Sequence, residues 1–475
     1  MVVRLEDALH GATKAYVEAP AGFGKTHLIL NTISEHPESK QLVLTHAIAG
    51  VAALRSRLEQ SKIDSGGVSI NTIAGWTQRY VRSYPELAGV KLADLDAMNV
   101  GAYWSTINIA FTKLLDNSNV LDIIRANYDG VYVDEYQDCS IAQHATILKL
   151  ADSLPVRILG DPLQGIFDFN NDMVPWGDVE ASFAHIATLD TPHRWINASN
   201  EAYGAWLLDV RSRLLAGENI DLNSAPPCVE VVMLSGDDVE DKKQYLKEAR
   251  KSLPMDRHRM IIGDKQNAIS KNLIKSLSHP RYILIESLDS KDVAEIKSYA
   301  EAMDRLGKDV DLTFYDVLRK CFTGLSPLSG PVTKIKVDPN YRPQKPIFQA
   351  FASLHKQFEP ELAQRILKAV EKATGVSCHR RQLISILDIA LSGLIAGDYA
   401  DFATAADSAV ESIRQRGRRL PRYSVGSTLL VKGLQVDEVL LMNANQLSTR
   451  DLYVALTRPT RKIVIFTNNL VLSPR

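Results

Sequence analysis

A glycine-rich turn that ends in lysine and threonine is the first stretch of this chain whose residue types could do chemistry. Its glycines let successive backbone N–H groups face a polyphosphate, and the positive end of a following helix adds to the attraction. Lys25 could then reach the β- and γ-phosphates while the Thr26 hydroxyl ligates Mg²⁺. A chance loop is the alternative. We expect a nucleotide site in the run Ala19-Pro20-Ala21-Gly22-Phe23-Gly24-Lys25-Thr26, with Ala19, Gly22, Gly24, Lys25 and Thr26 around the phosphates.

Two adjacent carboxylates follow the apolar run Val131-Tyr132-Val133. Ligands of open α/β sheets bind at the carboxyl ends of the strands, where this run would deliver Asp134 and Glu135. We expect Asp134 to hold Mg²⁺, directly or through water, and Glu135 to position or deprotonate the attacking water. The alternative is an exposed acidic turn after a buried strand.

A third polar segment, Gly160-Asp161-Pro162-Leu163-Gln164, again follows an apolar run. Gln164 could sense the γ-phosphate. Phe167 and Phe169 come next at alternate positions and could stack on bases, an interaction worth about 1–3 kcal/mol per base. By themselves, two phenylalanines are more often core residues.

Alternating strands and helices must position these groups, because polar residues repeatedly follow short apolar runs. The pattern predicts an α/β fold with two lobes of the nucleotide-hydrolase type and helical insertions. The expected lobes are residues 1–222, with a helical insert at about 77–128, and 223–475, with a reduced helical insert at about 310–420. Residues 194–214 are expected to form one helix. The predicted strands are Ala15–Val17, Gln41–Thr45, Gly130–Val133, Val156–Leu159, His185–Leu189, Val229–Leu234, Met260–Gly263 and Tyr282–Ile285.

The composition is that of a globular protein, with 475 residues, 45% apolar and 23% charged. No apolar run is long enough for a membrane span, so we expect no membrane partner and a cytoplasmic location. Four scattered cysteines form no CxxC pair, which argues against zinc, an iron–sulfur cluster or a disulfide framework. A net charge of −1 neither supports nor excludes nucleic acid, because a local basic groove can exist within a neutral total.

The order of these motifs, GFGKT, VDEYQD, GDPLQGIF and PHRW, resembles the UvrD/Rep branch of superfamily 1 DNA helicases. The resemblance implies two RecA-like lobes with ATP and Mg²⁺ between them. It implies that Thr45 and His46, at the end of an apolar run, contact the DNA strand, as do Thr72 and Trp76 in a looser motif match. Phe167 and Phe169 would belong to the same DNA path.

The family resemblance also assigns groups that close the nucleotide site. His193 would stack on the nucleotide base, and Arg194 would be an arginine finger. The segment from Val431 to Val439 resembles the family's KGLEF motif, with Gln435 in place of the glutamate that binds the ribose. The segment Leu452–Arg458 resembles its YVAxTR motif, with Arg458 as a second finger from the other lobe. Such a guanidinium accelerates phosphoryl transfer by about 10³–10⁵-fold.

Several departures from the family pattern bear on function. No glutamine occurs before Gln41, so the residue that reads adenine in the family has no counterpart, and the choice between ATP and GTP stays open. The family's histidine near the KGLEF motif is replaced by Leu429. The inserts that engage duplex DNA in large helicases are short here.

The resemblance implies a helicase or translocase with single-stranded-DNA-stimulated ATPase activity and 3′→5′ movement on single strands or single-stranded ends. The compact build also resembles the helicase-like subunit of the Gabija anti-phage system, which works beside an OLD-family nuclease. The alternative function is therefore a nucleotide-gated sensor or assembly subunit that acts with such a nuclease. A recombination accessory subunit is a third option. The arginine-rich segment 414–422 could grip phosphates or an acidic partner, or be a solvated linker.

Overall fold

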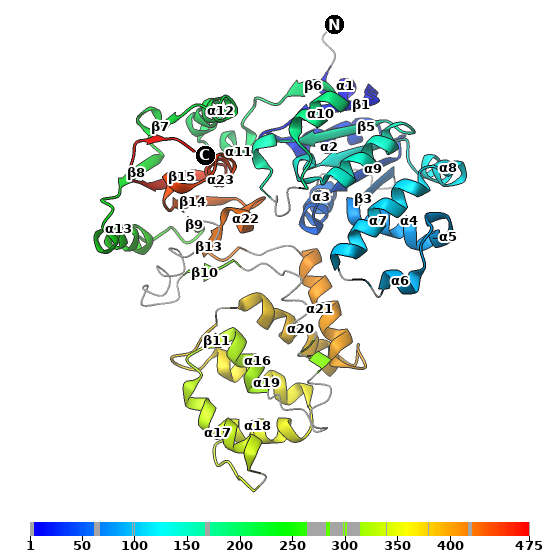
Figure 1. The fold of residues 1–475 in the computed structure, drawn as a ribbon. Coiled ribbons are helices and arrows are strands. Elements are labelled where there is room, and N and C mark those ends of the chain that lie inside the picture. The colour runs from blue at the N-terminus through cyan, green and yellow to red at the C-terminus, as the bar shows by residue number, and fades with distance from the viewer. Residues whose placement is uncertain are drawn as a thin grey trace. The chain divides into compact units, whose positions relative to one another are not determined.

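A computed structural model describes residues 4–60, 67–96, 98, 100–166, 172–263, 282–285, 298, 300–301, 314–338, 340–378, 380–416 and 420–474. The chain divides into two compact units, the first formed by Met1–Ser270 with Ser427–Arg475 and the second by Lys271–Gly426. The predicted α/β fold class with two parallel sheets is confirmed (Figure 1). Within the described ranges, every helix falls short of the length and apolarity that a membrane span requires.

The first sheet of the first unit has six parallel strands in the order β3-β2-β4-β5-β1-β6. The strands β2, β4 and β5 are buried along their whole length, as expected for a parallel sheet that is covered on both faces. The carboxyl ends of β1, β4 and β5 therefore lie at one edge, beside one another. The strand bounds are β1 Lys14–Glu18, β2 Gln41–Thr45, β3 Val68–Thr72, β4 Gly130–Asp134, β5 Val156–Gly160 and β6 Ala184–Thr188.

Two apolar clusters cover the faces of this sheet, because successive strand residues point to opposite sides. Leu42 and Leu44 pack with the helical stretch before β4, whereas Val43 packs with the helices that follow β1 and β2. The mostly helical stretch between Trp76 and Asp129 is present as predicted. The helices of this region are α1 Leu5–Gly11, α2 Lys25–Glu35, α3 Ile48–Gln60, α4 Ile73–Ser83, α5 Pro85–Ala88, α6 Leu92–Asp96, α7 Val100–Leu114, α8 Ser118–Asn127, α9 Ile141–Ala151 and α10 Trp176–Ser182, with short 3₁₀ turns η2 Tyr136–Asp138 and η3 Pro162–Gln164.

The structure corrects two predictions in the first unit. The segment 194–214 is two helices, α11 His193–Ile196 and α12 Glu201–Leu215, and the turn between them includes Ser199 in a left-handed conformation with φ of 53°. The edge strand β3 is absent from the predicted set. Only its central residue, Ile70, is buried, so β3 lacks the continuous apolar run by which the other strands were predicted.

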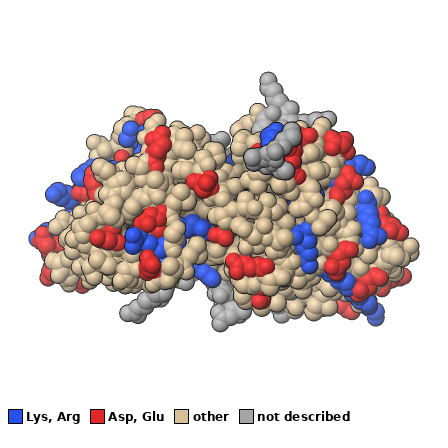
Figure 2. Space-filling model, turned by 90° about the horizontal axis from the view of Figure 1, so that it is seen from above, with Lys and Arg blue, Asp and Glu red and all other residues tan. Residues whose placement is uncertain are grey.

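The first unit also contains a parallel sheet with strands in the order β9-β14-β15-β8. Figure 2 shows acidic and basic side chains interspersed over the face of the molecule seen from above. The remaining elements of this unit are β7 Ile220–Asp221, η4 Leu222–Ser224, β8 Val229–Met233, α13 Asp238–Arg250, β9 Arg259–Gly263, α22 Thr428–Val431, β14 Val436–Leu441, η5 Ala444–Gln446, α23 Thr449–Leu456, β15 Pro459–Thr467 and β16 Val471–Leu472.

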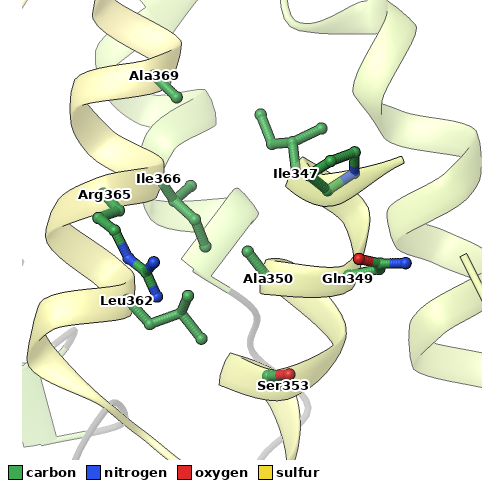
Figure 3. Close-up of a pocket in the computed structure, with 9 residues that line it drawn as sticks. Ile347, Gln349, Ala350, Ser353, Leu362, Arg365, Ile366 and Ala369 are labelled. Carbon is green, nitrogen blue, oxygen red and sulfur yellow. The ribbon is translucent and has the colours of Figure 1, made fainter. Parts of the chain in front are cut away.

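The second unit is mainly helical, as predicted for the insert at about 310–420, and has an apolar core of its own. An open groove of about 500 Å³ runs between α18 and α19, with Ile347, Ala350 and Ile366 among its apolar lining residues and Arg365 among its polar ones (Figure 3). The elements are β10 Ile283–Leu284, α16 Phe314–Cys321, β11 Phe322–Thr323, α17 Ser326–Val337, α18 Pro346–Lys356, α19 Pro360–Glu371, β12 Ser377–Cys378, α20 Arg381–Ala396, α21 Phe402–Arg416 and β13 Tyr423–Ser427, which pairs in parallel with β10.

Candidate functional site

The turn between β1 and α2 has the backbone that a phosphate-binding loop requires. Gly22 and Gly24 have φ of 85° and 95°, values at which an L side chain is strained. Close packing also demands glycine, since a Cβ on Gly24 would lie 2.9 Å from the His193 ring and one on Gly22 would lie 3.0 Å from Arg194 Cβ. Helix α2 begins at Lys25, so its free N–H groups face the same loop.

Lys25 joins this loop to the carboxylates at the end of β4. Its Nζ lies 3.0 Å from Asp134 Oδ1 and 2.7 Å from Glu135 Oε1. Burial alone would lower the pKa of Lys25, but the two carboxylates raise it above its usual value. Burial raises the pKa of Asp134, whereas Lys25 and Lys432 outweigh burial and lower the pKa of Glu135 to about 2. Glu135 is therefore ionised throughout the neutral range.

The backbone and a neighbouring glutamine fix the orientation of Glu135. Its φ of 58° places it in the left-handed region, an uncommon conformation for glutamate and one that recurs at functional sites. Gln137 donates from Nε2 to Glu135 Oε2 at 2.5 Å and accepts at Oε1 from the Asp161 N–H at 3.0 Å. Gln137 was not among the predicted site residues, although it lies inside the motif that carried Glu135.

Gln164 lies at the same edge of the sheet, in the 3₁₀ turn after β5. Its Nε2 donates to Asp161 Oδ2 at 3.0 Å, and the Ala21 N–H donates to the same oxygen at 3.2 Å. The predicted γ-phosphate sensor is thus tied to the phosphate loop through Asp161, which is completely buried. The motif Gly160-Asp161-Pro162-Leu163-Gln164 indicated a role for Gln164 but none for Asp161.

Arg194 and Arg458 approach the site from α11 and from the short link between α23 and β15. Arg194 donates from Nη1 to the carbonyl of Thr457, and Arg458 donates from Nε to the carbonyl of Val454 at 2.8 Å. Neither guanidinium has a carboxylate within ion-pair distance in the described part of the chain. Burial lowers the pKa of Arg194 to about 9, with a further contribution from Arg458, and burial lowers the pKa of Arg458 to about 10. Both remain positively charged at neutral pH.

Lys432 is a site residue to which the sequence analysis gave no role. Its Nζ donates to Asp138 Oδ1 and to the Gln164 carbonyl oxygen, and it lies between α22 and β14 of the second sheet. Burial raises the pKa of Asp138 to about 6, because this effect exceeds that of Lys432. The position of Lys432 in the KGLEF-like segment was the signal that could have identified Lys432 as a site residue.

The residues predicted to hold the base and the ribose are exposed. His193 lies against Gly24 and leaves much of its ring accessible, so the predicted base stack is sterically open. Gln435 is exposed on the turn before β14. Thr26 lies in the first turn of α2, and Ala19 is fully buried, with its N–H donating to the Gly160 carbonyl at 2.8 Å.

Two of the predicted DNA contacts have buried side chains. Trp76 has no exposed surface, and Thr45 is 1% exposed, so neither offers a face to a base or a strand. Thr72 is the N-cap of α4, where its hydroxyl accepts from the Gly75 N–H at 2.9 Å. His46 is half-buried, and burial followed by the charge of Lys432 lowers its pKa. The remaining predicted contacts, Phe167 and Phe169, lie outside the described residues.

Trp76 belongs to the core instead, because its ring packs edge-on against Tyr80 and Phe111 at centroid distances of 5.1 and 5.0 Å. We expect Trp76→Ala to lower the free energy of unfolding by about 3–5 kcal/mol. Trp104→Ala, at a half-buried position, should cost less. Chemical denaturation of both variants measures this difference. Unchanged stability of Trp76→Ala, together with lost affinity for single-stranded DNA, would restore Trp76 as a DNA contact.

Comparison with known proteins identifies part of this region. Residues 99–174 match the sequence model of the UvrD/REP helicase N-terminal domain. This match covers Asp134, Glu135, Asp161 and Gln164. None of the curated proteins matches the chain.

Among solved structures, the chain is similar to the Arterivirus nonstructural protein 10 helicase in complex with DNA, with 11% identity and a TM-score of 0.36 over 97% of this chain and 62% of that one. A structure of the same helicase without DNA gives 10% identity and a TM-score of 0.32 over 97% and 61%. The chain thus spans about three fifths of the length of these helicases. Residues 99–174 are thus similar in sequence to the UvrD/REP helicase N-terminal domain.

Proposed function

We propose that the chain is a nucleotide-driven DNA helicase or translocase of the UvrD/Rep type, which hydrolyses ATP between its two parallel sheets. Lys25 and the glycine loop would bind the phosphates, and Thr26 with Asp134 would hold Mg²⁺. Glu135 would orient or deprotonate the attacking water, and Gln164 would respond to the γ-phosphate. These roles rest on the arrangement of the groups around one edge of the first sheet.

The observation that carries the proposal is a pair of guanidinium groups, Arg194, which is half-buried, and Arg458, which is 1% exposed. Desolvated charges in proteins are normally paired, because an unpaired buried charge is costly. Within the described residues, every hydrogen bond that these two cations donate goes to an uncharged oxygen. A bound anion would supply the missing charge, and a triphosphate held by Lys25 would place its γ-phosphate in reach of such groups.

The residues present also fit the cation that accompanies a nucleotide. Asp134 and Glu135 are hard oxygen ligands of the kind that Mg²⁺ prefers, and both are now occupied by Lys25. Asp134 and Thr26 would hold Mg²⁺, and the bound cation would supply positive charge that neutralises the phosphates. Lys25 would then leave the carboxylates for the phosphates, so that each negative group keeps a positive partner.

Movement on DNA would follow from contacts that join the two sheets. Lys432 binds Asp138 and the Gln164 carbonyl, and Arg194 binds the Thr457 carbonyl, so groups at the phosphate site are bonded directly to the second sheet's elements. A change at the γ-phosphate would alter these bonds and shift one sheet against the other. His46, which is half-buried and whose pKa responds to Lys432, would be a contact for the DNA strand, and the 3′→5′ polarity would follow the family resemblance.

A second function is favoured by the burial of Thr45 and Trp76. The nucleotide site keeps its catalytic groups, whereas two of the predicted DNA contacts are inaccessible. This contrast fits a nucleotide-gated sensor or assembly subunit, which would act with a partner nuclease of the OLD type in anti-phage defence. Such a subunit would bind nucleotide tightly and show little unwinding, whereas a helicase would show turnover that rises with single-stranded DNA.

The proposed function is tested by Arg458→Ala, with Arg461→Ala, three residues further along in β15, as the matched control. Loss of the Arg458 finger should reduce nucleotide hydrolysis by about 10³–10⁵-fold, because the developing charge on the γ-phosphate loses its cation. Arg461 is 46% exposed and pairs with Asp437 at 3.3 Å, so its removal should leave turnover unchanged. Steady-state hydrolysis assays of both variants give the comparison. Equal rates for Arg458→Ala and the unaltered protein would contradict the proposal.

A further inference from the structure

A buried ion network lies directly beneath the phosphate loop. The Asp161 carboxylate, which is 0% exposed, accepts four hydrogen bonds from groups of different elements. Its Oδ2 accepts from the Ala21 N–H at 3.2 Å and from Gln164 Nε2 at 3.0 Å. Its Oδ1 accepts from the Leu163 N–H at 3.3 Å and from Arg211 Nη2 at 3.4 Å. One carboxylate therefore holds both the phosphate loop and the predicted γ-phosphate sensor.

Arg211 is the cation of this network, and it reaches the site from α12. The same Nη2 also donates to Glu18 Oε1, at the end of β1. The side chains of Arg211, Glu18 and Asp161 are 7%, 15% and 0% exposed, so solvent screens their charges little. Arg211 thus joins the carboxyl end of β1, which leads into the phosphate loop, to that of β5, its neighbour in the sheet.

Helix α12 also contacts α23, the helix that precedes Arg458. Tyr203, two turns before Arg211, donates from its hydroxyl to the Leu456 carbonyl at 2.8 Å. Tyr453 of α23 interacts with the Asp161 carboxylate as well. Arg211 therefore lies on a helix that is hydrogen-bonded to α23, and the Asp161 carboxylate that Arg211 binds also contacts α23.

We propose that Arg211, paired with Glu18, is a positioning residue that fixes the Asp161 carboxylate and thereby the phosphate loop and Gln164. This inference rests on the proposed nucleotide hydrolysis. Without Arg211, Glu18 and Asp161 would be two uncompensated carboxylates under the site where a triphosphate binds, and their charge would repel it. Asp161 would also lose its fixed orientation, so Gln164 would lose the partner that orients its amide.

Two separate effects should therefore follow from Arg211→Gln. The dissociation constant of a fluorescent ATP analogue should rise about tenfold through the phosphate loop, and kcat should fall about tenfold through Gln164. Glu18→Gln leaves Arg211 paired with Asp161, so both changes should stay within about threefold. Arg213→Gln is the control on the same helix: Arg213 is 43% exposed and pairs with Asp209, and its removal should change neither quantity.

A double-mutant cycle separates positioning from a general structural effect. In a Gln164→Ala background, Arg211→Gln should still weaken nucleotide binding but should lower kcat no further, because the group through which it acts is already gone. A merely structural role would lower kcat equally in both backgrounds, which would overturn the inference, as would unchanged binding and turnover in Arg211→Gln. Should Arg211→Gln fail to fold, Arg211→Lys replaces it in the cycle, since a lysine keeps the charge without the fork that spans both carboxylates.

Nucleotide binding and hydrolysis by the unaltered protein distinguish a failure of the positioning role from a failure of the proposed function. Absence of nucleotide binding and hydrolysis in the unaltered protein would refute both together. Binding and hydrolysis that are insensitive to Arg211 would refute only the positioning role.

Discussion

Glu135→Gln is expected to slow nucleotide hydrolysis by about 10²–10⁴-fold while nucleotide binding is retained. Glutamine cannot accept the proton of the attacking water, but it can still accept the hydrogen bond that Gln137 donates to Glu135. It fits the left-handed backbone as well as glutamate does. Lys25 keeps Asp134 as its partner at 3.0 Å. The fold and the phosphate loop should therefore be preserved.

Single-turnover hydrolysis and equilibrium binding of a fluorescent ATP analogue measure the two halves of this prediction. Glu38→Gln is a suitable control, because Glu38 is 73% exposed and lies away from the phosphate loop, after α2. Removing the negative charge of Glu135 should also tighten nucleotide binding slightly, since one repulsion of the phosphates is lost. Hydrolysis by Glu135→Gln at a near-normal rate would remove the assignment of Glu135 as the base.

Lys25→Ala is expected to abolish both nucleotide binding and turnover, and also to destabilise the free protein. Lys25 is 9% exposed and forms ion pairs with both Asp134 and Glu135. Its loss therefore leaves two neighbouring carboxylates with less positive charge beside them. Breaking a buried pair in this way costs about 3–5 kcal/mol. Thermal unfolding without nucleotide should therefore show a lower Tm for this variant.

Added Mg²⁺ provides an internal check on the Lys25→Ala variant. A cation that binds the vacated carboxylates should restore part of the lost Tm, and the gain should be larger than for the unaltered protein. Lys40→Ala, at an exposed position before β2, is the control. A Lys25→Ala protein that binds nucleotide with unchanged affinity would contradict the role of Lys25 in the phosphate site.

Local sequence patterns predicted most of the fold and the groups at the ends of strands. The strand β2 matches its predicted bounds, Gln41–Thr45, and β4 and β5 each extend one residue beyond theirs, because fully buried strands appear as continuous apolar runs. The polar residues that follow those runs are the ones that meet at the site. The break between α11 and α12 was missed because its turn includes Ser199 in a left-handed conformation, for which the sequence gives no strong signal.

Ion pairs between residues far apart in the sequence are the part of the site that local patterns could not predict. Arg211 and Glu18 are separated by 193 positions, and Lys432 and Asp138 by 294, so no local pattern links them. Arg211 did leave one sign, since it lies on the apolar face of α12, four residues after buried Leu207 and next to buried Val210. A charged residue on such a face requires a partner, although the sequence does not say which.

The family resemblance predicted a DNA contact at Trp76, whereas the structure buries this side chain in the core. Its motif match was loose, and the aromatic spacing of α4 and α7 also fits a core helix pair. Burial against Tyr80 and Phe111 decides between the two interpretations.

The most direct test of the central claim is hydrolysis of ATP and GTP by the purified protein, with and without single-stranded DNA. We expect nucleotide hydrolysis that depends on Lys25 and rises several-fold when single-stranded DNA is added. Turnover without DNA stimulation would favour the nucleotide-gated subunit over the motor. Failure to bind or hydrolyse either nucleotide, by a folded protein, would contradict the account as a whole.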